Sequence, residues 1–266
     1  MPTDAALGRI VVENLEAWYA AQADVPGIEV HRDPDITWMI SNGTTWANSG
    51  TSLRFDAKTA RKRLDQVFEH YSAHRRAIGF WVDEEATPAD LADHLKRLGL
   101  RCRKRFPGMW CDLKKRPAIA APEGVRIIRT PHHSMYLRHP HPYFGPITTP
   151  IRQHELNRLA HLAAQSPDRF FDFVALAAGN RPVGACSMFL SESAAGFYDV
   201  GVLESERGRG IGSAMMAHAL NFAQQRGTAQ AILLASGMGH GMYARAGFHE
   251  VCTIAYWYRA LSGKST

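Results

Sequence analysis

The sequence predicts an α/β fold in which helices flank a mixed sheet, and three observations carry this prediction. Strand-like apolar runs alternate with helical spacing through most of the 266 residues. A glycine-rich turn within residues 202–216 joins a buried strand to a helix. One pattern also occurs in both halves of the chain: a helix, a glycine–apolar pair, a turn and an aromatic strand. Together they predict a tandem of two similar halves.

The two halves meet near residues 114–122. Pro117 and Pro122 enclose small residues there, a composition typical of an extended linker. We therefore predict an N-terminal domain over residues 1–116 and a C-terminal domain over residues 123–266.

The second half shows the clearer succession of elements. Gly179-Asn180 separates two apolar runs and predicts the turn of a hairpin. The expected elements are a strand at 125–129, a helix at about 151–164, hairpin strands at 173–177 and 183–188, a strand at 197–203, a helix to about residue 225, a strand at 229–235, a helix around residue 243, and a final strand at 253–259.

The first half fits a shorter version of the same order. We expect strands at 36–40, 77–82 and 109–113 and helices at about 57–72 and 88–99, the second beginning at a proline and ending at a glycine. Leu95 occupies the place that Tyr243 has in the second half, and the glycine-rich turn is missing. This half is either a degenerate copy without cofactor chemistry or a generic α/β extension.

The glycine-rich turn is an anion cradle. Gly208, Gly210 and Gly212 allow a close approach of the backbone and unusual dihedral angles. The first N–H groups of the following helix have no partner within it, and the helix dipole favours negative charge. Arg207 and Arg209 add positive charge, so a phosphate group is the expected ligand.

Two common phosphate loops are excluded. A P-loop requires Lys followed by Ser or Thr after its last glycine, whereas Ser213-Ala214 follow Gly212. A dinucleotide fingerprint requires G-x-G-x-x-G and an acidic residue about 20 positions later. Here the glycines are one residue too close, and no Asp or Glu lies between Glu206 and Glu250.

What remains, Arg207-x-x-Gly210-x-Gly212 between a strand and a helix, resembles the acetyl-CoA pyrophosphate loop of the GNAT (GCN5-related) N-acetyltransferase superfamily. A second match lies about 30 residues downstream, where Ser236, Gly239, Tyr243 and Gly247-Phe248 resemble that family's pattern of small residues, Tyr and Gly-Phe. The resemblance covers residues 123–260 and implies the GNAT acyl-CoA N-acyltransferase fold.

The resemblance also implies a cofactor, acetyl-CoA, and a set of residues for it. The backbone of 200–202 would hold the pantetheine arm, and 208–213 would hold the pyrophosphate. Tyr243 would protonate the departing thiolate; the alternative is a helix tyrosine with a buried ring and a hydrated hydroxyl. The expected cofactor-binding residues are Val200, Gly201, Val202, Arg207, Gly208, Arg209, Gly210, Ile211, Gly212, Ser213 and Ser236.

An amine must lose a proton before it attacks a thioester, so a base is expected. Asp199 is the nearest carboxylate, and strand alternation places it on one face with Gly201, where burial would raise its pKa. The alternative is a solvated or arginine-paired Asp. The rigid histidine-rich segment 139–146 supplies acceptor-site candidates, namely His141, Tyr143 and Phe144. No carboxylate or cysteine lies close to its His-x-His, and no metal is expected.

Composition sets the remaining expectations. Lys and Arg number 31 against 25 Asp and Glu, a net charge of +6 that suits an anionic cofactor without requiring a nucleic-acid partner. The four cysteines form no C-x-x-C pair, no apolar run is long enough for a membrane span, and the N-terminus lacks signal-peptide features. We therefore expect a cytoplasmic protein, a monomer or a homodimer, without a membrane partner.

The predicted activity is transfer of an acetyl group from acetyl-CoA to a primary amine of a small molecule or peptide, by direct attack. The alternatives are a non-catalytic acyl-CoA-binding regulatory module and an interaction scaffold without CoA affinity.

Overall fold

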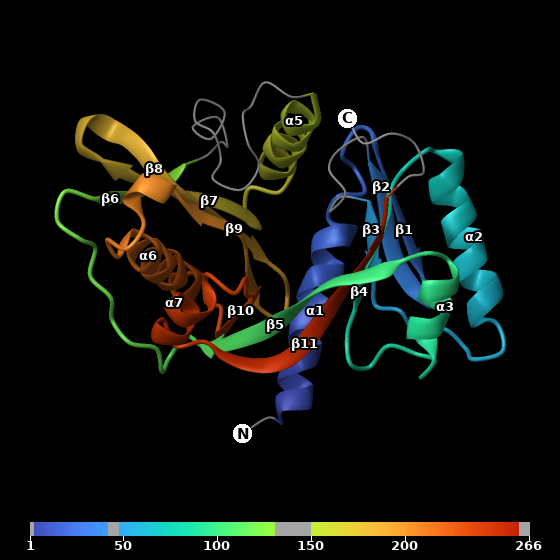
Figure 1. Ribbon diagram of the computed structural model, residues 1–266. Helices are drawn as coiled ribbons and strands as arrows, with labels where there is room; N and C mark the ends of the chain where they lie inside the picture. The colour runs from blue at the N-terminus through green and yellow to red at the C-terminus, as the bar shows by residue number, and fades with distance from the viewer. Residues whose placement is uncertain (1–2, 42–47, 131–149, 261–266) are drawn as a thin grey trace. The chain divides into compact units, whose positions relative to one another are not determined.

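A computed structural model describes residues 3–41, 48–130 and 150–260. Its elements, shown in Figure 1, are α1 (Asp4–Ala20), β1 (Ile28–Asp33), β2 (Ile36–Ser41), β3 (Ser49–Thr51), α2 (Ala60–Ala73), β4 (Ile78–Val82), α3 (Leu91–Arg97), β5 (Arg101–Asp112), β6 (Arg126–Thr130), α5 (Pro150–Gln165), β7 (Phe170–Ala177), β8 (Arg181–Leu190), β9 (Ala195–Val202), α6 (Ile211–Gln225), β10 (Gln230–Leu234), α7 (His240–Arg245) and β11 (His249–Arg259).

These elements form two compact units, each of which draws on both ends of the chain. Residues 1–14 and 107–251 make up one, here called the C-terminal unit, and residues 15–106 and 252–266 make up the other, the N-terminal unit. The boundaries fall inside α1, β5 and β11, so these three elements each contribute residues to both units. The functional division into 1–116 and 123–266 stays a prediction.

Both units contain a mixed sheet of the same design. In the C-terminal unit the strand order is β5-β10-β9-β8-β7-β6, and in the N-terminal unit it is β1-β2-β3-β4-β11. The β9–β10 pair and the β3–β4 pair are parallel, whereas the other registered pairs within the units are antiparallel. A helix connects each parallel pair, α6 in one unit and α2 in the other, as parallel strands require. The predicted mixed sheet with flanking helices is confirmed.

The strand after each parallel pair is exchanged between the two repeats. Along the chain β3-α2-β4-α3-β5 has the same order as β9-α6-β10-α7-β11. However, Gly108–Asp112 of β5 pair with β10, and residues 255–259 of β11 pair with β4. The final strand of each repeat therefore completes the sheet that contains the other repeat's parallel pair.

The helix ends before these strands have the same backbone geometry. Gly99 and Gly247 both have positive φ, +82° and +100°. The N–H of Leu100 donates to the carbonyl of Leu95 at 3.0 Å, and that of Phe248 donates to the carbonyl of Tyr243 at 3.1 Å. Both patterns are of the kind that glycine C-caps make. The structural equivalence of Leu95 and Tyr243 that the sequence suggested is thus confirmed at the level of hydrogen bonds.

Most expected elements are present with shifts of a few residues, and β5 is longer because it begins at Arg101. The sequence analysis assigned no structure to residues 5–35, where α1 and β1 lie. Each unit has its own core. The one around α6 combines Met215, Met216 and Leu220 with strand residues such as Phe173 and Met188, and Figure 1 shows this helix against the strands.

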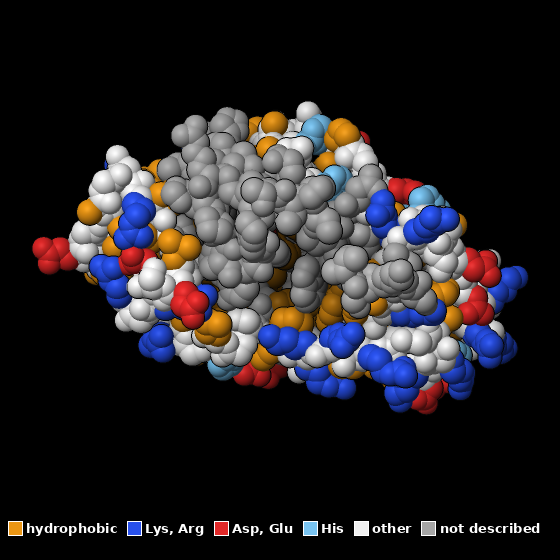
Figure 2. Space-filling view, turned by 45° about the horizontal axis from the view of Figure 1, so that its top comes forward, with side chains coloured by type: hydrophobic (Ala, Val, Ile, Leu, Met, Phe, Trp, Pro, Cys, Tyr) orange, Lys and Arg blue, Asp and Glu red, His pale blue; other side chains and the backbone are white. Residues whose placement is uncertain are grey.

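Two further global features bear on partners. No helix among the described residues is long and apolar enough to cross a membrane. Figure 2 shows Lys and Arg side chains interspersed with Asp and Glu over the described part of one face.

Candidate cofactor and catalytic site

The parallel strands β9 and β10 separate at the centre of the C-terminal unit. Their register runs from Ala195–Ala231 to Phe197–Leu233 and stops there, although β9 continues to Val202. Beyond Phe197 the backbone of β9 on this side has no registered strand partner among the described residues. A ligand with amide groups finds hydrogen-bonding backbone here that a continuous ladder would have occupied.

A β-bulge interrupts β9 at the same point. Ser187 of β8 pairs with Tyr198, and Ala185 pairs with Gly201, so two residues of β9 stand opposite the single residue Cys186. Asp199 lies in this bulge with φ +50°, a conformation that Asp tolerates better than most residues.

The bulge corrects the face assignment made from alternation. Paired residues of neighbouring strands share a face, so Gly201 lies on the face of Tyr198, whereas strict alternation puts them on opposite faces. Because period-2 alternation assumes one residue per position, the extra residue at the bulge reverses the order after it. The prediction that Asp199 and Gly201 share the face opposite Tyr198 was therefore derived from a strand without this bulge.

The strand before the bulge is held by α1. The Tyr198 hydroxyl donates to Asn14 Oδ1 at 2.7 Å, and Asn14 Nδ2 donates to the Ser191 hydroxyl at 2.9 Å and to the Ala194 carbonyl at 3.0 Å. Asn14 is completely buried, and an added Cβ at Gly196 would lie 2.0 Å from its Oδ1. Sequence reasoning missed Asn14, because a lone Asn in an amphipathic helix carries no motif.

The glycine-rich turn presents unpaired N–H groups to solvent. None of the backbone N–H groups of residues 208–213 has an acceptor among the described residues; the first one bonded is that of Ala214, which donates to the Gly210 carbonyl. Gly208 and Gly210 have φ of +77° and +78°, and a Cβ at either would meet no atom within 4 Å. Left-handed residues that aim successive N–H groups outward form an anion-binding concavity, here at the N-terminus of α6. The residues fit a pyrophosphate group.

Gly212 has a different role from the other two glycines. A Cβ at this position would lie 2.7 Å from Met242 Sδ and 3.5 Å from Val202 Cγ2. Its φ is not in the left-handed region. The absence of a side chain therefore allows α6 to pack closely on α7. A bulky residue at Gly212 would therefore first disturb this packing, so Gly212 has a packing role beside the phosphate-binding role that the sequence predicts.

The charges at the turn form a triad. Glu206 is buried, with 8% of its side chain exposed, and its carboxylate accepts hydrogen bonds from Arg181 Nη2 at 2.6 Å and from Arg209 Nη1. The Arg181 hydrogen bond, with the charges of both guanidinium groups, holds the pKa of the Glu206 carboxyl below its ordinary value. Two cations and one anion leave one net positive charge beside the turn. Arg207 is exposed and donates Nε to the Val202 carbonyl at 3.2 Å.

The sequence predicts that Arg209 adds positive charge at the turn, and the structure adds that Glu206 partly balances this charge. Arg181 was missed because it comes from β8, 25 residues before Glu206. Glu206 is evident in the sequence, but nothing in the sequence indicates that its side chain is buried.

Tyr243 lies in α7, the helix that follows β10 along the chain. It is 6% exposed and belongs to the core cluster against which Val200 and Val202 pack. A Cβ at Gly239 would lie 2.7 Å from Tyr243 Cε2 and 3.3 Å from Ser236 Oγ, so the phenol ring packs directly on that glycine. Ser236 Oγ accepts the Gly239 N–H at 3.2 Å, a hydrogen bond in the turn that begins α7.

The structure therefore brings most of the predicted residues into one unit, in one core cluster or at its edge. Tyr243 belongs to the cluster and Val200 and Val202 pack against it, and the 208–213 turn follows β9 after the short 3-10 helix Glu204–Glu206. The acceptor-site candidates His141, Tyr143 and Phe144 lie outside the described residues.

The corresponding turn of the N-terminal unit has the opposite chemistry. Before α2 the Asp56 carboxylate accepts the Lys58 N–H at 2.8 Å, and the Asp56 carbonyl accepts those of Thr59 and Ala60. The N–H groups are thus bonded internally, and a negative charge stands where an anion would bind. The Tyr19 hydroxyl forms a 2.5 Å hydrogen bond with the Ser49 hydroxyl of β3 and accepts one from Trp81 Nε1 of β4 at 2.9 Å.

Comparisons with known proteins agree with this geometry. A family model described as the Acetyltransferase (GNAT) family matches residues 134–248. No curated protein matches the chain in sequence.

Solved structures that are similar cover nearly the whole chain. A GCN5-related N-acetyltransferase from Kribbella flavida has a TM-score of 0.67 at 17% identity, covering 94% of this chain and 96% of that one. A tandem GNAT protein from the clavulanic acid biosynthesis pathway has 0.62 at 13%, covering 96% of each chain. A GCN5-related N-acetyltransferase from Sphaerobacter thermophilus has 0.62 at 15%, covering 99% and 95%. These likenesses show that the chain has the predicted tandem GNAT fold, and the match of residues 134–248 shows that this part of the chain is similar to the Acetyltransferase (GNAT) family.

Proposed function

We propose that this protein transfers an acetyl group from acetyl-CoA to a primary amine of a small molecule or peptide. The observation that carries the proposal is the run of unpaired N–H groups at residues 208–213, a few residues after a strand that separates from its parallel neighbour. The unpaired N–H groups suit a pyrophosphate. The unpartnered backbone of the strand suits the amide-bearing pantetheine arm that is attached to that pyrophosphate.

The assigned residues divide the reaction between them. Backbone groups of Val200–Val202 orient the pantetheine arm and polarise the thioester carbonyl. As the amine nitrogen attacks the carbonyl carbon, the C–N bond forms and the C–S bond breaks. Asp199 takes the proton that the amine loses, and Tyr243 donates a proton to the leaving sulfur.

The N-terminal unit takes no cofactor in this proposal, because Asp56 caps the turn that corresponds to the anion cradle. We expect one CoA per chain in a calorimetric titration. Two CoA molecules per chain would show that the N-terminal unit retains a site. A cytoplasmic location stays a prediction from the scattered cysteines.

The decisive experiment compares two glycines with the same strain at opposite ends of α6. Gly210 and Gly227 have φ of +78° and +85°, and a Cβ at either meets no atom within 4 Å. Gly210→Ala and Gly227→Ala should therefore cost a similar amount of stability, about 1–2 kcal/mol. Only Gly210→Ala disturbs the N–H groups of the cradle. We expect acetyl-CoA affinity, measured by calorimetry, to fall about 10- to 100-fold in Gly210→Ala, the loss of one charge-assisted hydrogen bond or more.

Equal affinities of the two variants would remove the basis for the cradle. Thiol release with a panel of amines then separates catalysis from binding. Tight acetyl-CoA binding without release for any amine class would favour the regulatory module over the enzyme.

A further inference from the structure

Three side chains with metal-ligating atoms lie close together in the N-terminal unit. They are distant in sequence from the residues proposed for acetyl transfer. Glu29 and His31 come from β1, and His70 comes from α2. Their ligand atoms all lie within 4.8 Å of one another. Glu29 Oε1 is 2.5 Å from His31 Nε2 and 3.0 Å from His70 Nε2.

Topology explains why these residues meet. Glu29 and His31 are two positions apart on a strand, so their side chains share a face. His70 faces them from the last turn of α2, 39 residues later. No spacing motif in the sequence reveals a set of ligands assembled from a strand and a helix in this way, and the histidines that the sequence analysis examined for a metal were those of segment 139–146.

The nitrogen of His70 is incompletely satisfied as the site stands. Its Nε2 is buried and has no hydrogen-bond partner among the described residues. The Glu29 oxygen lies 3.0 Å away, but this contact does not have hydrogen-bond geometry. A buried polar atom without a partner carries a desolvation cost, and a metal ion between the three ligand atoms would remove it.

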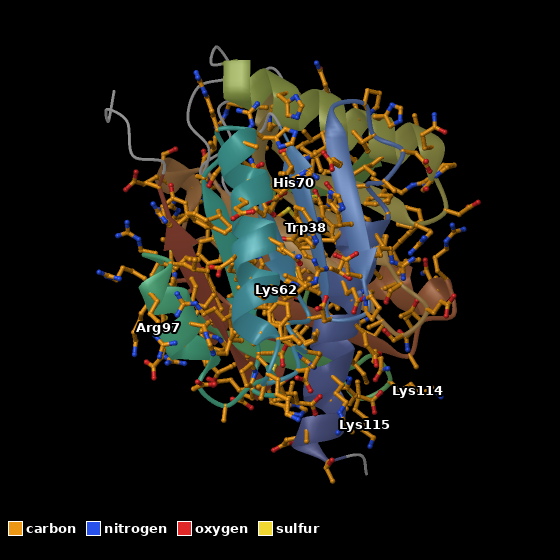
Figure 3. All side chains as sticks on the ribbon, turned by 90° about the vertical axis from the view of Figure 1, so that its right-hand side faces the viewer. Trp38, Lys62, His70, Arg97, Lys114 and Lys115 are labelled. Carbon is orange, nitrogen blue, oxygen red and sulfur yellow. The ribbon has the colours of Figure 1, made fainter. Side chains whose placement is uncertain are left out.

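Aromatic packing holds both imidazoles in place. Trp38 stacks on His31, with ring centroids 3.8 Å apart and planes at 7°, and its edge contacts His70 at 5.1 Å. Figure 3 shows Trp38 and His70 next to each other, the first from β2 and the second from α2. Trp38 Nε1 donates to Asp33 Oδ2 at 3.1 Å, which in turn fixes the indole. His74 stacks on the outer side of His70 at 4.7 Å.

Two imidazoles and a carboxylate form a ligand set that Zn²⁺ takes in proteins, with a fourth position left for water. Imidazole also suits Cu²⁺ and Ni²⁺. Zinc–ligand distances of about 2.0–2.2 Å in a tetrahedron place neighbouring donor atoms about 3.3 Å apart. To meet this geometry the Glu29 oxygen has to move away from each of the two nitrogens by less than an ångström, and the nitrogens of His31 and His70, which lie within 4.8 Å of each other, have to reach the same spacing.

We propose that Glu29, His31 and His70 form a binding site for a divalent transition-metal ion, Zn²⁺ foremost, which ties strand β1 to helix α2. The site is independent of acetyl transfer, because none of its residues belongs to the cradle or the strand separation. Its predicted effect is on the stability of the N-terminal unit, since an ion that binds only the folded state raises the melting temperature.

The test uses the full-length protein, freed of metal by a chelator and titrated with ZnCl₂ in a calorimeter. Because the chain has 13 histidines, other weak sites can contribute heat. The informative quantity is therefore the difference between the number of Zn²⁺ sites in the wild type and in each variant. His31→Ala, His70→Ala and Glu29→Gln should each remove one tight site, or weaken it at least tenfold, and abolish the Zn²⁺-dependent rise in melting temperature.

His94→Ala is the matched control. His94 pairs with Asp90 at 3.4 Å in the same unit but has no second histidine in its group. It should bind Zn²⁺ with the wild-type number of sites. Glu29→Gln replaces one carboxylate oxygen of a partly exposed side chain with an amide group. It is therefore the variant with which to test the site if an alanine variant does not fold.

A spectroscopic measurement locates the ion. Bound Cu²⁺ quenches the fluorescence of a nearby indole, and Trp38 stacks on one of the ligands. Stoichiometric Cu²⁺ should quench part of the emission of the six tryptophans, and Trp38→Phe should lose that part while still binding Zn²⁺. Wild-type Zn²⁺ stoichiometry and affinity in Glu29→Gln, His31→Ala and His70→Ala would overturn the proposal, as would Cu²⁺ quenching that persists in Trp38→Phe.

Discussion

Tyr243 combines two demands in one side chain. Its ring is buried in the core of the C-terminal unit, against Gly239 and Phe248. Its hydroxyl is the proposed proton donor to the CoA thiolate. Both interpretations that the sequence allowed, a packed helix tyrosine and a catalytic acid, therefore meet at one position, and only the hydroxyl distinguishes them.

Removing that hydroxyl alone tests the catalytic role. Tyr243→Phe keeps the ring contacts, so stability and acetyl-CoA affinity should stay close to wild type. Turnover should fall by about 10²–10⁴-fold, the usual contribution of a general acid. The loss should appear in both kcat and kcat/KM, because the proton is transferred in the transition state. A variant with wild-type kcat, measured where the chemical step limits the rate, would reassign the tyrosine to packing.

At the scale of single residues, the motif predicted the backbone conformation of the glycines at the turn but not the side chains that these residues contact. Gly208 and Gly210 have the conformations that the glycine pattern indicated, whereas Gly212 is required by Met242. Arg209 is paired with a buried carboxylate rather than free. These differences depend on contacts between segments far apart in the sequence, which local patterns do not contain.

At the scale of elements, the bulge in β9 decides where Asp199 points. The helices and strands of the second half were predicted closely from periodicity and turn residues, because both are local properties. The bulge was not, since one inserted residue leaves no signal in a short apolar run. In the structure, the bulge is accompanied by the positive φ of Asp199.

The bulge also determines which substitution tests Asp199 as the base. Asn adopts positive φ about as readily as Asp, so Asp199→Asn should keep the backbone and the acetyl-CoA affinity. Without the carboxylate, turnover should fall by about 10²-fold or more, and the limb of the pH–rate profile that reports the base should disappear. Asp199→Ala, which cannot adopt this φ without strain, serves as the control for backbone effects. An unchanged pH profile in Asp199→Asn would place the base elsewhere.

At the scale of the whole molecule, the exchanged strands are the main feature that the sequence did not reveal. The repeat was visible, because a helix, a glycine–apolar pair and an aromatic strand are local. The partner of each strand was not, since β5 and β11 have the apolar pattern of a strand whichever sheet they join. The linker at 117–122 therefore separates two repeats in sequence without separating two complete sheets.

Splitting the chain in that linker gives a direct test. A fragment 1–116 lacks the strand that pairs with β4, and a fragment 123–266 lacks the strand that pairs with β10. We expect each fragment, expressed alone, to be unfolded or aggregated by circular dichroism and size-exclusion chromatography, because an open interior edge exposes apolar surface. The two co-expressed fragments should form a folded complex that binds acetyl-CoA, as should the intact protein cleaved in the linker. A monomeric, cooperatively melting fragment 1–116 would contradict the importance of the exchange.

The reciprocal strands also fix an order of events on the ribosome. Residues 15–106 of the N-terminal unit are made before residues 107–251 of the C-terminal unit, yet β4 acquires its antiparallel neighbour only when residues 255–259 have been made. At about 5–20 residues per second, translation of the intervening residues 83–254 takes about 10–35 s. During that interval the edge of β4 is open, and chaperones that shield strand edges have time to act on it. The sheet of the N-terminal unit, most of which is synthesised early, is therefore the last to be completed.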